Sequence, residues 1–274
     1  MGISDTPPAD TPRWLIPLHT ALLGIGVLLW DATYILMTRR ALATKSYSMP
    51  LVALAANLSW EVIYVFYVCE VPLETFGFLF WLILDIGLVY TTLRFGAEDW
   101  KHTWPWVGRN IAWVLGFLTL LGGVAQYVLA AAWLAEPHVG SGLKYGKWWK
   151  GREGYDTTEL AFWSAGACQV VLGVTSLAML KSRGHSGGTG YAIWFCRAMG
   201  TIFGLVLDNL VMWWYWPQPH GFIVSFRGVM LWGTAVACDL VYPFLLWRIR
   251  RSEIVLPSGQ VIRGDSKGDK RKHQ

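Results

Sequence analysis

The chain has 274 residues, of which 54% are hydrophobic and 15% are charged, and it carries a net charge of +5. With a mean hydropathy of +0.38, this composition excludes one or two ordinary soluble domains. The 18 tryptophans instead suit a bilayer, whose interfaces favour aromatic side chains. The sequence therefore predicts an all-α integral membrane protein.

The polar segment 1–15 has no basic stretch followed by a short apolar core, so we expect a disordered leader rather than a signal peptide. Apolar runs then recur, each long enough to cross a hydrocarbon layer of about 30 Å. We place these spans at 16–37, 49–69, 76–94, 110–135, 160–180, 191–214 and 229–247. They predict a single bundle of seven transmembrane helices over 16–250, followed by a basic cytosolic tail over 251–274.

The distribution of lysine and arginine predicts a lumenal N-terminus and a cytosolic C-terminus. The loops after the first, third and fifth spans and the tail hold 16 of these cations, counting Arg94 at the end of the third span, whereas the opposite end holds 6. Four cations in the loop at 136–159 oppose this orientation. The basic charge is thus interpreted as an orientation signal, and no nucleic-acid partner is expected. The sequence does not indicate an oligomeric state.

Five carboxylates and Arg197 fall within the spans, and an intramembrane charge is a functional candidate by default. They are Asp31, Glu61, Asp85, Arg197, Asp208 and Asp239. Interhelical hydrogen bonding that holds the spans together is the competing explanation for each of them.

Depth along the helices separates these residues. Glu61, Asp85 and Asp239 lie near the bilayer midplane, whereas Asp31 and Arg197 lie towards the cytosolic ends of their spans. We expect Asp31 and Arg197 to form a structural ion pair, because leaving either charge unpaired in the membrane is costly. Asp208 lies towards the lumenal end, either as a residue of a wet mouth or as part of a site.

Helical spacing places further polar groups beside the midplane acids. Asn57, Glu61 and Tyr64 lie at i, i+4 and i+7, which predicts one polar face on an apolar helix. Asp239 and Tyr242 repeat this arrangement at i and i+3. Such faces are expected to look into the bundle.

A carboxylic acid surrounded by hydrocarbon tends to stay protonated, because its charged form is poorly solvated, and it can then donate a proton. Aromatic faces attract cations without being nucleophilic, so they can hold a carbocation. The candidates for such a lining are Trp60, Tyr64, Trp213, Trp214, Tyr215, Trp232 and Tyr242. For each of these taken singly, packing or a membrane-interface belt is the alternative.

Other site types find little support. No lysine lies in a span, which excludes a retinal Schiff base, and the motifs HExxH and DDxxD do not occur. Cys69, Cys168, Cys196 and Cys238 have no metal-ligand spacing and are interpreted as small apolar packing residues. No metal or other cofactor is predicted. A proton-coupled transporter or small-molecule receptor, using Glu61 as part of a relay, is the alternative function.

The segment "YSMPLVALAANLSWEVIY" (Tyr47–Tyr64) resembles the fungal membrane-bound terpene cyclases of meroterpenoid and indole-diterpene pathways. The resemblance continues in "YTTLRFGAEDW" (90–100), "WWYWP" (213–217) and "LWGTAVACDLVYPFLLWRIRR" (231–251). The loop at 136–159 is longer than expected for the family, and Asp208 matches no position of its pattern.

The resemblance implies a multi-pass enzyme of the fungal endoplasmic reticulum. It would cyclise an epoxidised farnesyl- or geranylgeranyl-type chain attached to an aromatic, polyketide or indole group. The family's two essential acids match Glu61 and Asp239, which we expect to face one cavity. Asn57, Asp85 and Asp208 join the aromatic candidates as expected substrate-binding residues, with Asp85 in a supporting role.

Overall fold

Seven helices of the structure are long and apolar enough to cross a membrane, as the sequence predicts. The computed structural model describes residues 2–101 and 103–264. The spans comprise α1 (Leu15–Thr44), α2 (Leu51–Ile63) with η1 (Tyr64–Val68), α3 (Pro72–Trp100), α5 (Ile111–Trp133), α6 (Thr157–Arg183), α7 (Tyr191–Thr201) with η2 (Ile202–Leu207) and α8 (Asp208–Tyr215), and α10 (Phe226–Arg250).

Short elements connect the spans. They are α4 (Pro105–Arg109), the hairpin β1 (Trp148–Trp149) and β2 (Arg152–Glu153), α9 (Pro217–His220), η3 (Gly221–Val224), and the hairpin β3 (Ile254–Val255) and β4 (Val261–Ile262). Local signals set several helix boundaries. The Asp156 side chain accepts a hydrogen bond from the Glu159 backbone at the start of α6, and Gly184, at φ +66°, ends that helix.

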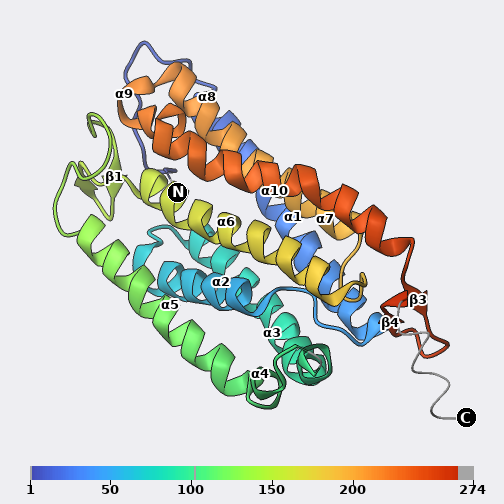
Figure 1. Ribbon diagram of the computed structural model, residues 1–274. Helices are drawn as coiled ribbons and strands as arrows, with labels where there is room; N and C mark the ends of the chain where they lie inside the picture. The colour runs from blue at the N-terminus through green and yellow to red at the C-terminus, as the bar shows by residue number, and fades with distance from the viewer. Residues whose placement is uncertain (1, 102, 265–274) are drawn as a thin grey trace, which may run out of the picture.

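Helix α6 lies in the middle of the bundle, between α2 and α5 on one side and α7 and α10 on the other (Figure 1). Helix α1 packs against both α3 and α7, which closes the bundle. The crossing of α1 with η2 is tight, because a Cβ at Gly26 would lie 2.6 Å from the Gly204 Cα. Small residues at this point therefore let two backbones approach closely.

The outer surface of the bundle is apolar. Helix α5 is the clearest case: Trp113 is 83% exposed, and Phe117 and Leu120 are also exposed. On α10, Phe244 is exposed in the same way. Large apolar side chains on an outer surface fit a lipid environment, so the protein is an integral, multi-pass membrane protein.

One end of the bundle is closed by three segments, and we call it the capped end. The segments are residues 2–14, the loop 134–156 with its β-hairpin, and α9; the β3–β4 hairpin lies at the opposite end (Figure 1). The N-terminal segment, expected to be disordered, is packed here. Asp5 is buried against Lys147, and the Thr6 amide donates to the Gly146 carbonyl at 2.8 Å.

Candidate active site

Glu61 lies in a buried polar cluster formed by three helices. Its Oε1 accepts hydrogen bonds from Asn57 Nδ2 at 2.8 Å, one helical turn away on α2, and from the Tyr34 hydroxyl of α1 at 3.1 Å. Asn57 Nδ2 also donates to Asp85 Oδ2 of α3, at 3.2 Å. The predicted polar face of α2 thus does look into the bundle, and it meets Asp85 there.

The two carboxyl groups of this cluster, on Glu61 and Asp85, share one amide and have no paired cation among the described residues. Both side chains are fully buried, and Glu61 Oε2 and Asp85 Oδ1 have no hydrogen-bond donor in the described part of the chain. Two neighbouring carboxyls without a counter-ion cannot both be ionised at reasonable cost. The arrangement therefore favours at least one retained proton. We call Glu61 and Asp85 the carboxyl pair.

A cavity of about 470 Å³ lies beside this cluster, between α1, α3, α6 and the α7–α8 span. An inner extension of about 70 Å³ reaches Tyr34 and Asn57, and it shares Trp60, Trp81 and Leu205 with the main cavity. Glu61 is not among the lining residues, although both of its hydrogen-bond partners are. The volume falls within the range of about 300–1,000 Å³ typical of small-molecule sites.

Aromatic side chains form one wall of the cavity. Trp60 contacts Phe78 and Trp81, with ring centroids 4.8 and 6.0 Å apart. Its indole Nε1 donates to Ser164 Oγ at 2.9 Å, and the Tyr64 hydroxyl lies 2.7 Å from the same oxygen. These bonds hold the Trp60 ring, so that the cavity presents fixed aromatic faces of the kind that attract cations.

Asp208 lines the main cavity near the capped end, together with His19 and Asn209. It is buried, its Oδ1 accepts from Asn209 Nδ2 at 3.1 Å, and its Oδ2 lies 4.0 Å from His19 Nδ1. A π-helical segment lies next to each of the two acids. The segment η2 ends directly before Asp208, and the segment η1 begins directly after α2, the helix that carries Glu61. Such π segments are often found at functional sites.

Asp239 does not line this cavity. Its carboxylate forms an ion pair with Arg197, whose guanidinium also donates to Ser176 Oγ at 3.1 Å. The expected ion pair of Arg197 with Asp31 is therefore wrong, because Arg197 on α7 points towards α10 and not towards α1. The carboxyls of Glu61 and Asp239 have different partners, so the structure does not bring the two expected acids into one cluster.

Most of the other aromatic candidates also lie away from the cavity. Trp214 is 70% exposed on the outer surface, and Tyr215 packs edge-on against Trp14. Trp213 and Trp232 pack in an apolar cluster around Phe222, and Tyr242 is hydrogen-bonded to Thr189 at 2.7 Å. Among the expected lining residues, Asn57, Trp60 and Asp208 face the cavity, and Tyr64 lies directly behind Trp60.

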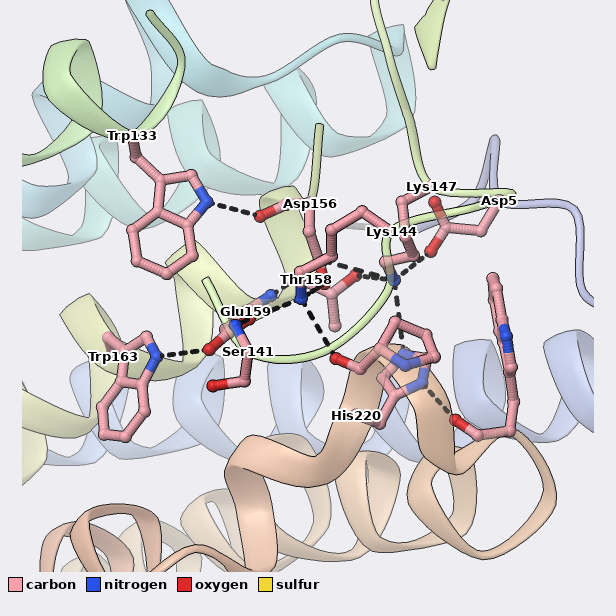
Figure 2. Close-up of polar contacts among 12 residues, drawn as sticks. Asp5, Trp133, Ser141, Lys144, Lys147, Asp156, Thr158, Glu159, Trp163 and His220 are labelled. Carbon is pink, nitrogen blue, oxygen red and sulfur yellow. Dashed lines mark hydrogen bonds and ion pairs between the residues drawn. The ribbon is translucent and has the colours of Figure 1, made fainter. Parts of the chain in front are cut away.

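The capped end contains a second buried polar cluster, formed around two lysines with no exposed surface (Figure 2). Lys144 Nζ donates to Asp156 at 2.8 Å and also contacts Glu159. Lys147 Nζ contacts Asp5 and lies 3.3 Å from both Asp156 Oδ1 and His220 Nε2. The cluster thereby joins the N-terminal segment, the long loop, α6 and α9.

Charge and burial compete in this cluster. Burial alone would raise the pKa of Asp156, but Lys147 and Lys144 hold it well below its usual range. Burial, followed by the Lys147 charge, keeps the pKa of His220 well below its usual value. The Nδ1–H of His220 donates to the Trp216 carbonyl at 2.8 Å, which leaves Nε2 to accept from Lys147. Two of the four loop cations that oppose the predicted orientation are thus neutralised internally.

Several residues of these sites are not identified by the sequence reasoning. Tyr34 and His19 are isolated polar side chains on an apolar helix. The only signal that could identify them is that they share the buried face of α1 with Thr33 and Met37. Lys144 and Lys147 lie in a loop with no apolar periodicity, where charged residues are normally exposed. For metal binding, residues 2–101 and 103–264 contain no group of three or more His, Cys, Asp or Glu side chains able to hold an ion.

Comparison with known proteins places these features in a family. A family model described as "Pyr4-like transmembrane terpene cyclases" matches residues 3–252. Terpene cyclase ascF of Acremonium egyptiacum is 32% identical over 274 residues, covering 97% of this chain and 94% of that protein. Pyr4-family terpene cyclase mfmH of Annulohypoxylon moriforme is 32% identical over 245 residues, covering 88% and 90% of the two chains. No solved structure matches the chain.

Proposed function

We propose that this chain, which belongs to the Pyr4-like transmembrane terpene cyclase family, cyclises an epoxidised prenyl chain by protonating it within the membrane. The observation that carries the proposal is the carboxyl pair, which has no counter-ion in the described part of the chain and lies next to an aromatic cavity. The substrate would be a farnesyl- or geranylgeranyl-type epoxide on an aromatic, polyketide or indole group. Such a chain is apolar and flexible, so it can fill a cavity that is lined mainly by apolar side chains.

Glu61 is the proposed acid in this reaction. Asp239 is less suited to that role, because it is paired with Arg197 and does not line the cavity. Glu61 shares its hydrogen-bond partner Asn57 with Asp85, and that arrangement favours retention of a proton. We assign Asp239 the role of neutralising Arg197 between α7 and α10.

The proton would reach the substrate through Tyr34, because Tyr34 lines the inner cavity and Glu61 does not. In the proposed step, Glu61 is protonated, and its hydrogen bond with Tyr34 runs opposite to the one that the ionised carboxylate would accept. The Glu61 carboxylic acid gives its proton to the Tyr34 oxygen while the Tyr34 O–H gives its own proton to the epoxide oxygen. General acid catalysis of this kind contributes about 10²–10⁴-fold to a rate.

Protonation breaks one C–O bond of the epoxide, and the electron pair of the nearest double bond forms the first ring. Each further closure moves the positive charge along the chain. Trp60, Phe78 and Trp81 would stabilise this charge without trapping it, because their faces are electron-rich and not nucleophilic. The apolar walls exclude water, which would otherwise add to the cation.

The test is turnover of an epoxyfarnesyl phenol in isolated membranes, with products identified by mass spectrometry and an ionophore present to remove ion gradients. Glu61→Gln keeps size and hydrogen bonding but removes the transferable proton, so we expect turnover to fall by at least about 10²-fold. Glu98→Gln makes the same chemical change at an exposed glutamate of α3 outside the cavity lining and serves as the matched control. Unchanged cyclisation by folded Glu61→Gln protein would overturn the assignment, and a dependence on the gradient would favour a transporter.

A further inference from the structure

The cavity has carboxyl groups near both of its ends. The carboxyl pair lies behind Tyr34 and Asn57 at the inner end, whereas Asp208 lines the cavity directly near the capped end. The proposed initiation uses only the first of these groups. Asp208 is buried and lines the cavity, and the proposed initiation gives it no role, so its presence there needs an explanation.

A carbocation cascade needs two proton transfers at different places. The first transfer opens the epoxide at one end of the chain, and the last removes a proton where the final cation rests. Because every ring closure carries the charge away from the epoxide, the acid that starts the reaction is poorly placed to end it. A base at the opposite end of the cavity is what the chemistry requires.

We infer that Asp208 is the base that ends the cascade, so that the substrate lies with its epoxide at Tyr34 and its head group towards the capped end. This inference rests on the proposed function. In the final step, a C–H bond next to the cationic carbon breaks, its electron pair forms a double bond, and the Asp208 carboxylate takes the proton. Where a head-group hydroxyl closes the last ring, its oxygen forms the C–O bond and Asp208 takes the O–H proton instead.

The surroundings of Asp208 suit a base. Burial favours the protonated form of the Asp208 carboxyl, as it does for Glu61, but the hydrogen bond that Oδ1 accepts from the Asn209 amide at 3.1 Å favours the ionised form that a base needs. His19 Nδ1, at 4.0 Å from Oδ2, is close enough to exchange the proton after a small movement. His19 and Thr158 line the same end of the cavity, near the polar cluster of the cap, so a proton released here has a short path out of the membrane interior.

One other carboxyl lines this end of the cavity and must be distinguished from Asp208. Glu74, in the first turn of α3, is buried beside Leu73 and Phe76 in the cavity wall. It lies across the cavity on a different helix from His19 and Asn209. If Glu74 were the base, its replacement, and not that of Asp208, would change the product.

The experiment measures substrate consumption and product identity separately, using the full-length enzyme in membranes. In Asp208→Asn, we expect initiation to continue while the last deprotonation slows by about 10²-fold. The normal product should then give way to water-quenched alcohols and alkene isomers, with substrate still consumed. The amide oxygen of the new asparagine can still accept the hydrogen bond from Asn209, so the protein should fold. Glu98→Gln, at an exposed residue of α3, should leave the product pattern unchanged.

Three results would overturn the inference. The first is an unchanged product from Asp208→Asn, the second is a product shift in Glu74→Gln alone, and the third is complete loss of consumption in folded Asp208→Asn, which would make Asp208 the starting acid. Asp208→Glu provides a second variant if the asparagine variant does not accumulate. Because it keeps a carboxylate but displaces it, we expect it to retain deprotonation and to change only the ratio of alkene isomers.

Different variants test the inference and the proposed function. Failure of the proposed function appears as normal consumption in Glu61→Gln, whereas failure of the inference appears in the products of Asp208→Asn.

Discussion

Arg197 and Asp239 form an ion pair between α7 and α10, and the Arg197 guanidinium also lies over the Tyr242 ring at 4.9 Å from its centroid. This pair provides the counter-ion of a membrane-embedded arginine for which the sequence predicted Asp31 as the partner. It also separates Asp239 from the cluster around Glu61.

Breaking this pair should destabilise the protein more than it alters the chemistry. Asp239→Asn leaves Arg197 buried without a counter-ion, which typically costs about 3–5 kcal/mol. We expect a lower melting temperature in detergent and less accumulated protein. The double variant Arg197→Met/Asp239→Leu removes both charges and should recover stability together with activity. A stable but inactive double variant would show that Asp239 takes part in the reaction itself.

Tyr34→Phe tests the proton path from Glu61 to the cavity. Loss of the hydroxyl should lower kcat by about 10–10²-fold with little change in KM, because the lost interaction acts on proton transfer and not on binding. Tyr67→Phe is the matched control, since Tyr67 packs against Tyr127 and Trp149 outside the cavity lining. Equal kcat values for the Tyr34 variant and the wild type would remove Tyr34 from the mechanism.

Asp85→Asn tests which member of the carboxyl pair supplies the proton. An asparagine at this position keeps the size of the side chain and can donate to Glu61, so it weakens but does not abolish the acid. We expect measurable turnover, lower than that of the wild type and higher than that of Glu61→Gln. If the order of the two variants were reversed in single-turnover experiments, Asp85 would be the acid.

Lys147→Met tests the closure of the capped end. The change leaves Asp5 without its paired lysine and removes one of the two cations next to Asp156, so we expect a loss of about 3 kcal/mol. Proteolysis of the N-terminal segment should also become faster, because Asp5 no longer holds it. Lys150→Met in the same loop is the control: Lys150 is exposed and should change stability by less than about 1 kcal/mol. Equal effects of the two changes would contradict the buried pair.

Because His220 is buried next to Lys147, we expect the folded protein to lose stability at mildly acidic pH. Its pKa is lowered in the folded protein by burial and by Lys147, although Asp156 opposes this effect, and His19 contributes in the same direction as Lys147. A folded-state pKa below the unfolded value of about 6.5 means that the unfolded state binds more protons, so stability falls as pH drops below that value.

The measurement is the melting temperature of the detergent-solubilised protein as pH falls from neutral through the unfolded-state pKa of histidine. His220→Gln should flatten the dependence over this interval, because glutamine can accept from Lys147 without titrating. His138→Gln changes an exposed histidine and should keep the wild-type slope. A slope that survives in His220→Gln would assign the effect to another group.

The sequence determined the membrane class, the seven spans and the polar face formed by Asn57 and Glu61. These features are local: hydropathy is read within one segment, and residues four apart share a helix face wherever that helix is placed. The resemblance carried by "NLSWE" and "CDLVY" also lies in short segments, and the family assignment it implied is confirmed.

Partner choice was decided only by the tertiary structure. Depth alone favours Asp31 as the partner of Arg197, and it allows Glu61 to meet either Asp85 or Asp239. The rotation of each helix about its axis, which packing against its neighbours sets, selects Asp239 for Arg197 and Asp85 for Glu61. The same holds for Asp5 and Lys147, which are far apart in sequence and acquire a buried partner only when the cap assembles.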